Sequence, residues 1–266
     1  MQKKPEKDKY IHPLDKIAID LQNEEKAYFL DQEVSSDFWE IQYAVATKET
    51  GSQFPQVTIK GKYDYDKPDS VHRLRFNQMP DFIPDFGNLT FLRGAKPTDI
   101  VSVGVFAAQG FLISEKGKKV FEQFNLGEHK FFPVKIAKKE ESYDYYWLHL
   151  SSDETDSIDY PNSIFYLQHG ILGTKREIIK IESKKDLHEK KEILKINFHV
   201  EKQEYKEIGP KKIVLTKQYN KDIDIIGFAR LGIELYITNR FKKAIEESGI
   251  TGIELIPSRK LFKTRG

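Results

Sequence analysis

Two stretches of this sequence follow one plan: FLISEKGKKVFEQFNLGEHKFFP (Phe111–Pro133) and LYITNRFKKAIEESGITGIELIP (Leu235–Pro257). They align without a gap at an offset of 124 residues. Each contains a short apolar run, then Ser or Thr, an amphipathic segment with the period of a helix, a glycine-containing turn, and a second apolar run that ends in proline. We therefore expect two similar strand–helix–strand units, near residues 111–133 and 235–257.

Side chains mark where the helix of each unit begins and ends. Ser114 and Thr238 stand at the N-cap, where a hydroxyl accepts a hydrogen bond from an otherwise unpaired backbone N–H. Gly127 and Gly249 stand where a helix can end in a left-handed conformation. The expected inner face has the helical period in both units: Val120, Phe121 and Phe124 in the first, and Phe241, Ala244, Ile245 and Ser248 in the second.

Much of the remaining chain has the pattern of strands. QVTIKGKY (56–63), YDYYWLHL (143–150) and KKIVLTK (211–217) are rich in aromatic and β-branched residues. Ser183 and Asp186 resemble a capping box, so we expect a short helix to begin there. Strands and helices are interleaved, which predicts an α+β fold that is sheet-rich with about three helices.

Two segments are less regular. Residues 39–45 fit the alternation of a strand and also the period of a helix, and the pattern does not separate the two. In RLRFNQMPDFIPDFGN (73–88), Pro80 and Pro84 forbid a regular helix or a central strand. The aromatic residues of that segment predict an irregular stretch packed against the core.

The expected domain organisation is simple. Residues 1–9 are charged and have the composition of a flexible tail. Residues 10–258 are expected to form a single α+β domain, or two closely packed lobes divided near 105–110, because nothing between the two units resembles a linker. Residues 259–266 are expected to form a basic C-terminal tail.

Composition excludes several classes of protein. The chain of 266 residues has no cysteine, so disulfides and thiolate sites are absent, which fits a reducing compartment. A charged N-terminus without a following apolar stretch and the lack of any long apolar run predict a cytoplasmic protein with no membrane contact. A net charge of only +2 argues against a dedicated nucleic-acid binder.

Catalytic motifs are missing, so we predict no enzyme activity and no catalytic, metal or cofactor-binding residue. Gly110 lies too far before Gly117 for a phosphate-binding loop. The seven histidines include no pair three or four residues apart, as a helical metal site would require. The alternative is an enzyme whose site assembles from distant residues such as His149, His169 and Asp159.

One stretch is acidic and aromatic. From Glu140 to Tyr160 there are seven acidic residues and no Lys or Arg. A strand followed by a polar loop would account for it, but acids also steer a basic partner and tyrosines anchor interfaces. The candidate interface residues are Glu140, Glu141, Tyr143, Asp144, Tyr145, Asp153, Glu154, Asp156 and Asp159.

A second stretch is basic. Residues 175–221 contain fourteen basic and eight acidic residues. Lysines at the solvated edge of a sheet explain such a run without any ligand. The functional alternative is nucleic-acid binding through this region.

The order of several segments resembles a known family. The segments DFWEIQYAV, RFNQMPDFIPDF, GFLISEKGKKVFEQFNLGEHKFFPVKI, YYWLHL, KKIVLTK and LYITNRFKKAIEESGITGIEL run from Asp37 to Leu255. Together they resemble bacterial immunity proteins of polymorphic toxin systems, of the type numbered family 43 and the related family 11. The resemblance implies a cytoplasmic antidote that binds and neutralises a cognate toxin protein and has no catalytic residues. It carries over no residue-level binding site.

Overall fold

Both expected units are present in the computed structural model, which describes residues 33–75, 78–103, 110–170, 175–199, 201, 203–229, 231–232 and 234–264. Within these ranges the chain forms 14 strands in three sheets and three α-helices, so the α+β prediction is confirmed. The flexible tail expected at residues 1–9 lies outside the described residues. Most of residues 105–110, where the chain was expected to divide if it forms two lobes, also lie outside the described residues.

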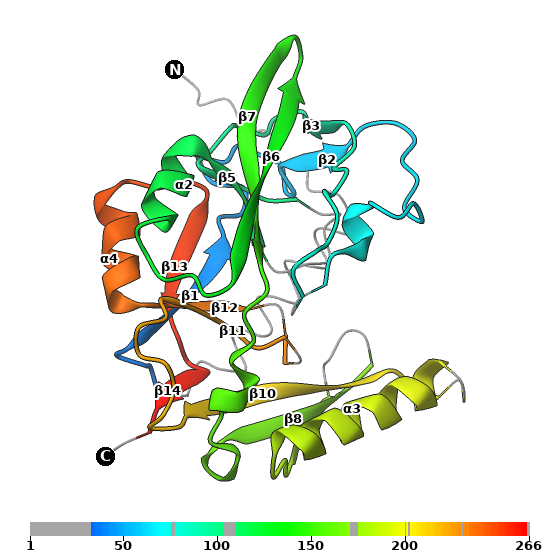
Figure 1. The fold of residues 1–266 in the computed structure, drawn as a ribbon, viewed down its shortest axis with the longest axis vertical. Helices are drawn as coiled ribbons and strands as arrows, with labels where there is room; N and C mark the ends of the chain where they lie inside the picture. Colours follow the sequence, from blue (N-terminus) through cyan, green and yellow to red (C-terminus); the bar gives the residue numbers. More distant parts are fainter. Residues whose placement is uncertain are drawn as a thin grey trace, which may run out of the picture.

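The first unit is part of a six-stranded sheet with the order β2-β3-β6-β7-β5-β4 (Figure 1). Its strands are β2 (Val57–Ile59), β3 (Leu89–Phe91), β4 (Ile100–Val101), β5 (Gly110–Ser114), β6 (His129–Lys138) and β7 (Glu141–Leu150). Helix α2 (Glu115–Phe121) connects β5 to β6. Both β5 and β6 pair antiparallel with β7, so the two strands of the unit are parallel to each other with β7 between them.

The second unit has the same arrangement in a four-stranded sheet with the order β11-β12-β1-β13. Its strands are β11 (Ile225–Gly227), β12 (Leu235–Thr238) and β13 (Ile253–Pro257), with β1 (Phe38–Tyr43) from the N-terminal part. Helix α4 (Asn239–Glu247) connects β12 to β13, and both of these strands pair antiparallel with β1.

The duplication therefore extends beyond the two quoted stretches. In each unit a further short strand covers the outer edge, with Ile100 opposite Ile113 in the first unit and Ile225 opposite Ile237 in the second. The pairing with two neighbours also resolves the ambiguous segment at residues 39–45. Most of it is strand β1, because its backbone groups are satisfied by β12 and β13 on either side.

A third sheet with the order β14-β10-β8-β9 and helix α3 form what we call the lower lobe, at the bottom of Figure 1. Its elements are β8 (Ile164–His169), β9 (Lys175–Ile179), α3 (Lys184–His199), β10 (Lys206–Leu215) and β14 (Leu261–Lys263). Helix α3 begins where the capping box predicts, with Ser183 Oγ accepting from Asp186 N at 3.1 Å. Residues 259–266 were expected to form a basic tail. Instead, β14 lies within this segment and pairs parallel with β10, and Lys260 is only 4% exposed.

Three apolar clusters hold these layers together. One lies between the two units and includes Phe121 from α2 and Phe241 from α4, whose ring centroids are 4.8 Å apart. Another lies under the six-stranded sheet and takes in Phe86 and, at its margin, Phe82. These two residues confirm that the proline-rich segment packs against the core. The third cluster joins the lower lobe to the second unit.

Candidate functional site

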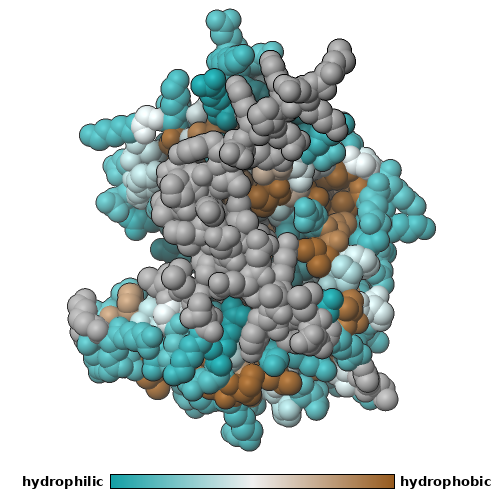
Figure 2. All heavy atoms as spheres, turned by 180° about the vertical axis from the view of Figure 1, so that it is seen from behind, coloured by the Kyte–Doolittle hydropathy of each residue, from teal (hydrophilic) through white to brown (hydrophobic). Residues whose placement is uncertain are grey.

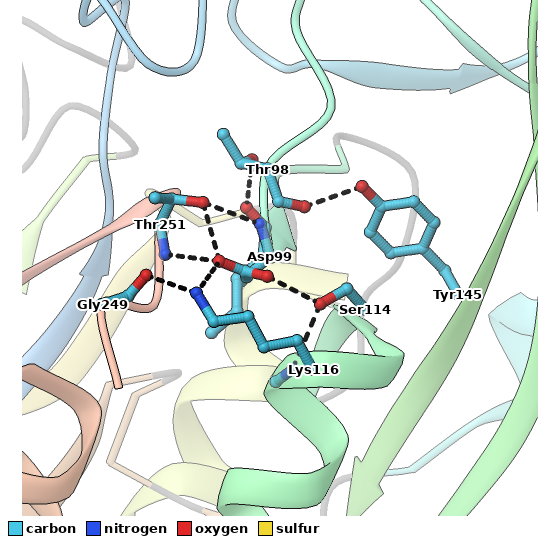
Figure 3. A network of polar contacts seen from close by, with 9 residues as sticks. Thr98, Asp99, Ser114, Lys116, Tyr145, Gly249 and Thr251 are labelled. Carbon is cyan, nitrogen blue, oxygen red and sulfur yellow. Dashed lines mark hydrogen bonds and ion pairs between the residues drawn. The ribbon is translucent and has the colours of Figure 1, made fainter. Parts of the chain in front are cut away.

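A partly buried carboxylate, that of Asp99, organises the point where the two units meet (Figure 3). The Oδ1 atom of Asp99 accepts a hydrogen bond from Ser114 Oγ at 2.9 Å, and Ser114 Oγ in turn accepts from Gly117 N, which confirms the predicted N-cap. Its Oδ2 atom accepts from Thr251 N at 3.0 Å and from Lys116 Nζ at 3.2 Å. Burial disfavours the ionised form, but the hydrogen bonds from Thr251, Ser114 and Lys116 outweigh it and hold the pKa of Asp99 below its ordinary value.

Asp224 repeats this arrangement in the second unit. Thr238 Oγ1 donates to Asp224 Oδ1 at 2.7 Å, and Arg240 Nη2 donates to Asp224 Oδ2 at 2.8 Å. Asn125 N donates to the same Oδ2 atom at 3.0 Å. Thr238 Oγ1 also accepts from Phe241 N, which confirms the second predicted cap. Each unit therefore contains an aspartate, a hydroxyl cap and a cation in the same order.

The two aspartates connect the units reciprocally. Asp99 binds the turn after α4 through Thr251, and Asp224 binds the turn after α2 through Asn125. Backbone bonds follow the same path, from Ile100 N to Thr251 O and from Asp224 N to Asn125 O. Because both carboxylates accept several hydrogen bonds that come from both units, they hold the two units together as one frame. Sequence reasoning missed this pair, although Asp99 and Asp224 precede their caps by 15 and 14 residues.

The first half of the acidic stretch lies on a hairpin of β6 and β7 that projects at the top of Figure 1. There the acids face lysines across the hairpin: Glu141 is opposite Lys138, and Asp144 is opposite Lys135. Lys135 Nζ and Asp144 Oδ1 are 2.6 Å apart, with both side chains about three-quarters exposed. Glu140 occupies the turn. The hairpin therefore carries mixed charge, although its second strand is acidic along the chain.

Tyr145 does not belong to this surface. Its side chain is 4% exposed, and its hydroxyl donates to Thr98 O at 2.7 Å. Burial raises the pKa of the phenol well above its usual range. The neighbouring Tyr143 is partly exposed and packs edge-on against Phe91. Tyr145 is therefore not part of a contact surface, because the alternation of side chains along β7 points it into the core.

The second half of the acidic stretch lies beyond the other end of β7, about 30 Å from the hairpin turn at the usual rise per residue. Here the acids stabilise two 3₁₀ turns. Asp153 Oδ1 accepts from Thr155 N at 3.1 Å and Ala229 N at 3.2 Å, and Asp159 Oδ2 accepts from Asn162 Nδ2 at 2.9 Å. Glu154 accepts from Ser157, and Asp156 pairs with Lys184. The nine candidates therefore do not form one patch.

The basic stretch supplies β9, α3 and β10 of the lower lobe. On α3 its lysines alternate with acids one turn away, as in the Lys185–Glu189 pair at 3.7 Å and the Lys190–Asp186 pair. Such ion pairs offset part of the positive charge on the helix surface, as expected for a solvated face.

The three residues of the dispersed-enzyme alternative are not brought into contact. His149 is fully buried, its Nε2 lies 3.0 Å from Gln78 O, and burial lowers its pKa. His169 lies between Glu177 at 2.9 Å and Glu204 at 3.4 Å. No described contact joins either histidine to Asp159. Among the residues whose placement is described, no group of three or more His, Asp or Glu side chains is arranged to hold a metal ion.

Two of the open hollows on the lower lobe lie beside the same turn, and sequence reasoning did not predict them. One, of about 660 Å³, is lined by residues 33–37 together with β10 and β14. The other, of about 600 Å³, is lined by residues 160–164 and 178–182. Both are surface depressions beside the 3₁₀ turn at Tyr160–Asn162.

Comparison with known families identifies the family of this chain. A family model described as "Immunity protein family (Imm11)" matches residues 37–260, which span both units and nearly all of the lower lobe. The chain belongs to this immunity protein family. Of the two families that the sequence resembles, family 11 is thus confirmed and family 43 is not. A search of curated proteins found no match. In the described part of this Imm11 chain, no helix combines the length and apolarity needed to span a bilayer.

Proposed function

We propose that this Imm11 protein binds and blocks a cognate toxin domain in the cytoplasm of the cell that makes it, through a protein–protein interface and without catalysis of its own. The family match over residues 37–260 carries this proposal, because immunity proteins act on toxins. The lack of cysteine is compatible with a reducing compartment.

The physical demands of such a role agree with the duplicated frame. An antidote must leave almost no free toxin, which requires a Kd of about 1 nM or less, or about −12 kcal/mol. A standard interface of roughly 1,600 Å² reaches that affinity when little ordering entropy is lost on docking. The reciprocal bonds of Asp99 and Asp224 tie the two units together before any partner arrives, so the frame meets this requirement.

Neutralisation can be tested directly. The gene beside this one that encodes a toxin domain is expressed in a growth assay with and without this protein. We expect rescue of growth and a complex of nanomolar affinity in calorimetry. Failure to rescue growth with every adjacent toxin candidate, together with no measurable binding, would contradict the proposal. A toxin domain from an unrelated system serves as the control for specificity.

A further inference from the structure

The outer face of the lower-lobe sheet, on the side away from α3, is built from residues of all four strands. The register pairs Ile178 with Tyr166 across β9 and β8 and Ile164 with Lys212 across β8 and β10. Val214 of β10 pairs with Phe262 of β14. Residues of one strand alternate between faces, so these side chains share one face, while Phe165, Ile179, Ile208, Ile213, Leu215 and Leu261 point into the core.

Apolar exposure concentrates on this lobe. Seven large apolar or aromatic side chains are well exposed among the described residues, and Val34, Ile164 and Ile178 lie on or beside the outer face. Ile178 is 58% exposed and Ile164 is 39% exposed. Figure 2 shows apolar side chains gathered at the bottom of the molecule, over this lobe. Exposed apolar clusters of this kind mark contact surfaces more often than isolated side chains do.

The two hollows beside the Tyr160–Asn162 turn adjoin on this face. Lys212 and Val214 line the first hollow, Ile164 and Ile178 line the second, and the paired residues Ile164 and Lys212 form the ridge between them. The turn at Tyr160–Asn162 borders both. A partner can therefore seat two side chains, one on each side of the ridge.

The cations of this face differ in their partners. Lys180 pairs with Glu182 at 2.7 Å, and the guanidinium of Arg176 lies over the Tyr166 ring, 5.0 Å from its centre. Lys212 instead has its Nζ 4.9 Å from the centre of the Phe262 ring, and no described ion pair includes it. A cation held over an aromatic ring beside exposed apolar side chains is suited to a carboxylate supplied from outside.

We propose that this outer face is where the toxin domain docks. The partner presents apolar side chains to Ile164 and Ile178 and a carboxylate to Lys212. This inference rests on the proposed function and adds to it the location and chemistry of the contact. It places the anchors near the middle of the interface and the charged turn of Asp156 at its rim, as in interfaces with an apolar core and a polar border.

The test uses the full chain and the adjacent toxin domain that it protects against. Ile178→Asp places a charge on the face, and Lys212→Glu reverses the charge of a cation on it. Ile83→Asp is the matched control, because Ile83 is 78% exposed and lies outside the lower lobe. Thermal unfolding first establishes that all three variants fold. We expect at least about 30-fold weaker binding for Ile178→Asp and about 10-fold for Lys212→Glu, with no change for Ile83→Asp.

The outcomes separate this inference from the proposed function. If the wild type binds toxin and both folded variants bind within about threefold of it, the docking face is wrong while the proposed function stands. If the wild type binds no adjacent toxin, both the proposed function and the proposed docking face are contradicted. If the free chain is a dimer that Ile178→Asp separates, a second copy occupies the face and the inference is overturned. Protection of β8 and β9 amides from hydrogen exchange in the complex would support it.

Discussion

Asp99 and Asp224 occupy equivalent positions in the two units, and each accepts a hydrogen bond from the other unit's turn. Asp99 Oδ2 accepts from Thr251 N and Asp224 Oδ2 from Asn125 N, both at 3.0 Å. Each carboxylate also holds the hydroxyl cap of its own helix. The duplicated helices are therefore fixed at their first turn by the residue that joins the two units.

Replacing Asp224 with Asn should destabilise the fold strongly. Asp224 is 1% exposed, and its described side-chain partners Thr238, Arg240 and Asn125 all donate, so the amide nitrogen of Asn would face a donor. We expect the free energy of unfolding to fall by about 2–4 kcal/mol in urea titrations. Asp144→Asn, on the exposed hairpin, should change it by less than about 0.5 kcal/mol. Equal effects of the two substitutions would contradict the role assigned to Asp224.

The contribution of Asp99 should depend on pH. Its folded-state pKa lies below the ordinary value of 3.8, so its carboxylate stabilises the fold at pH values above that range. This stabilisation is lost as the pH falls through the lowered pKa. The difference in urea unfolding between the wild type and Asp99→Asn should therefore be largest well above pH 3.8 and should shrink progressively as the pH falls below that value. A difference that stays constant over this range would argue against the ionised carboxylate.

Lys260 and Glu234 form a largely buried ion pair at 3.0 Å that attaches the C-terminal segment, with side chains 6% and 23% exposed. Lys260→Met alone should cost about 3 kcal/mol, because it leaves a carboxylate without its partner in a desolvated place. The double variant Lys260→Met with Glu234→Leu should recover most of that loss. Additive losses in a double-mutant cycle of urea unfolding would show that the pair is not coupled.

The acids beyond β7 should affect the rate of docking. We expect Glu154→Lys with Asp156→Lys to lower the association rate several-fold at low salt, with the effect shrinking as ionic strength rises. Glu141→Lys with Asp144→Lys, on the distant hairpin, is the comparison. Stopped-flow binding to the toxin domain measures both. A larger effect from the hairpin pair would move the proposed interface to the other end of β7.

Nucleic-acid binding through residues 175–221 should be weak. The acids paired with lysines on α3 lower the number of phosphates this surface can neutralise. We expect no shift of labelled duplex DNA or RNA at physiological salt. A specific complex with a steep salt dependence would favour this alternative instead.

Features that depend on near neighbours were predictable from the sequence. The caps at Ser114, Thr238 and Ser183, the two strand–helix–strand units and the α+β class follow from side chains within about one helix or strand of each other. These patterns act locally, so a single sequence contains them in full.

Features that depend on which segments of the chain pair or pack together were not predictable from the sequence. The strand inserted into the second unit, β1, lies about 200 residues before it in the sequence, whereas β7 of the first unit directly follows β6. Tyr145 was expected at the surface and is buried, and the acids of β7 meet lysines of β6 only across the hairpin. The apolar outer face of the lower lobe likewise assembles from four strands that include β14, which had been expected to be a tail. Strand pairing decides which face each side chain occupies, and the partner is chosen by the packing of the whole fold.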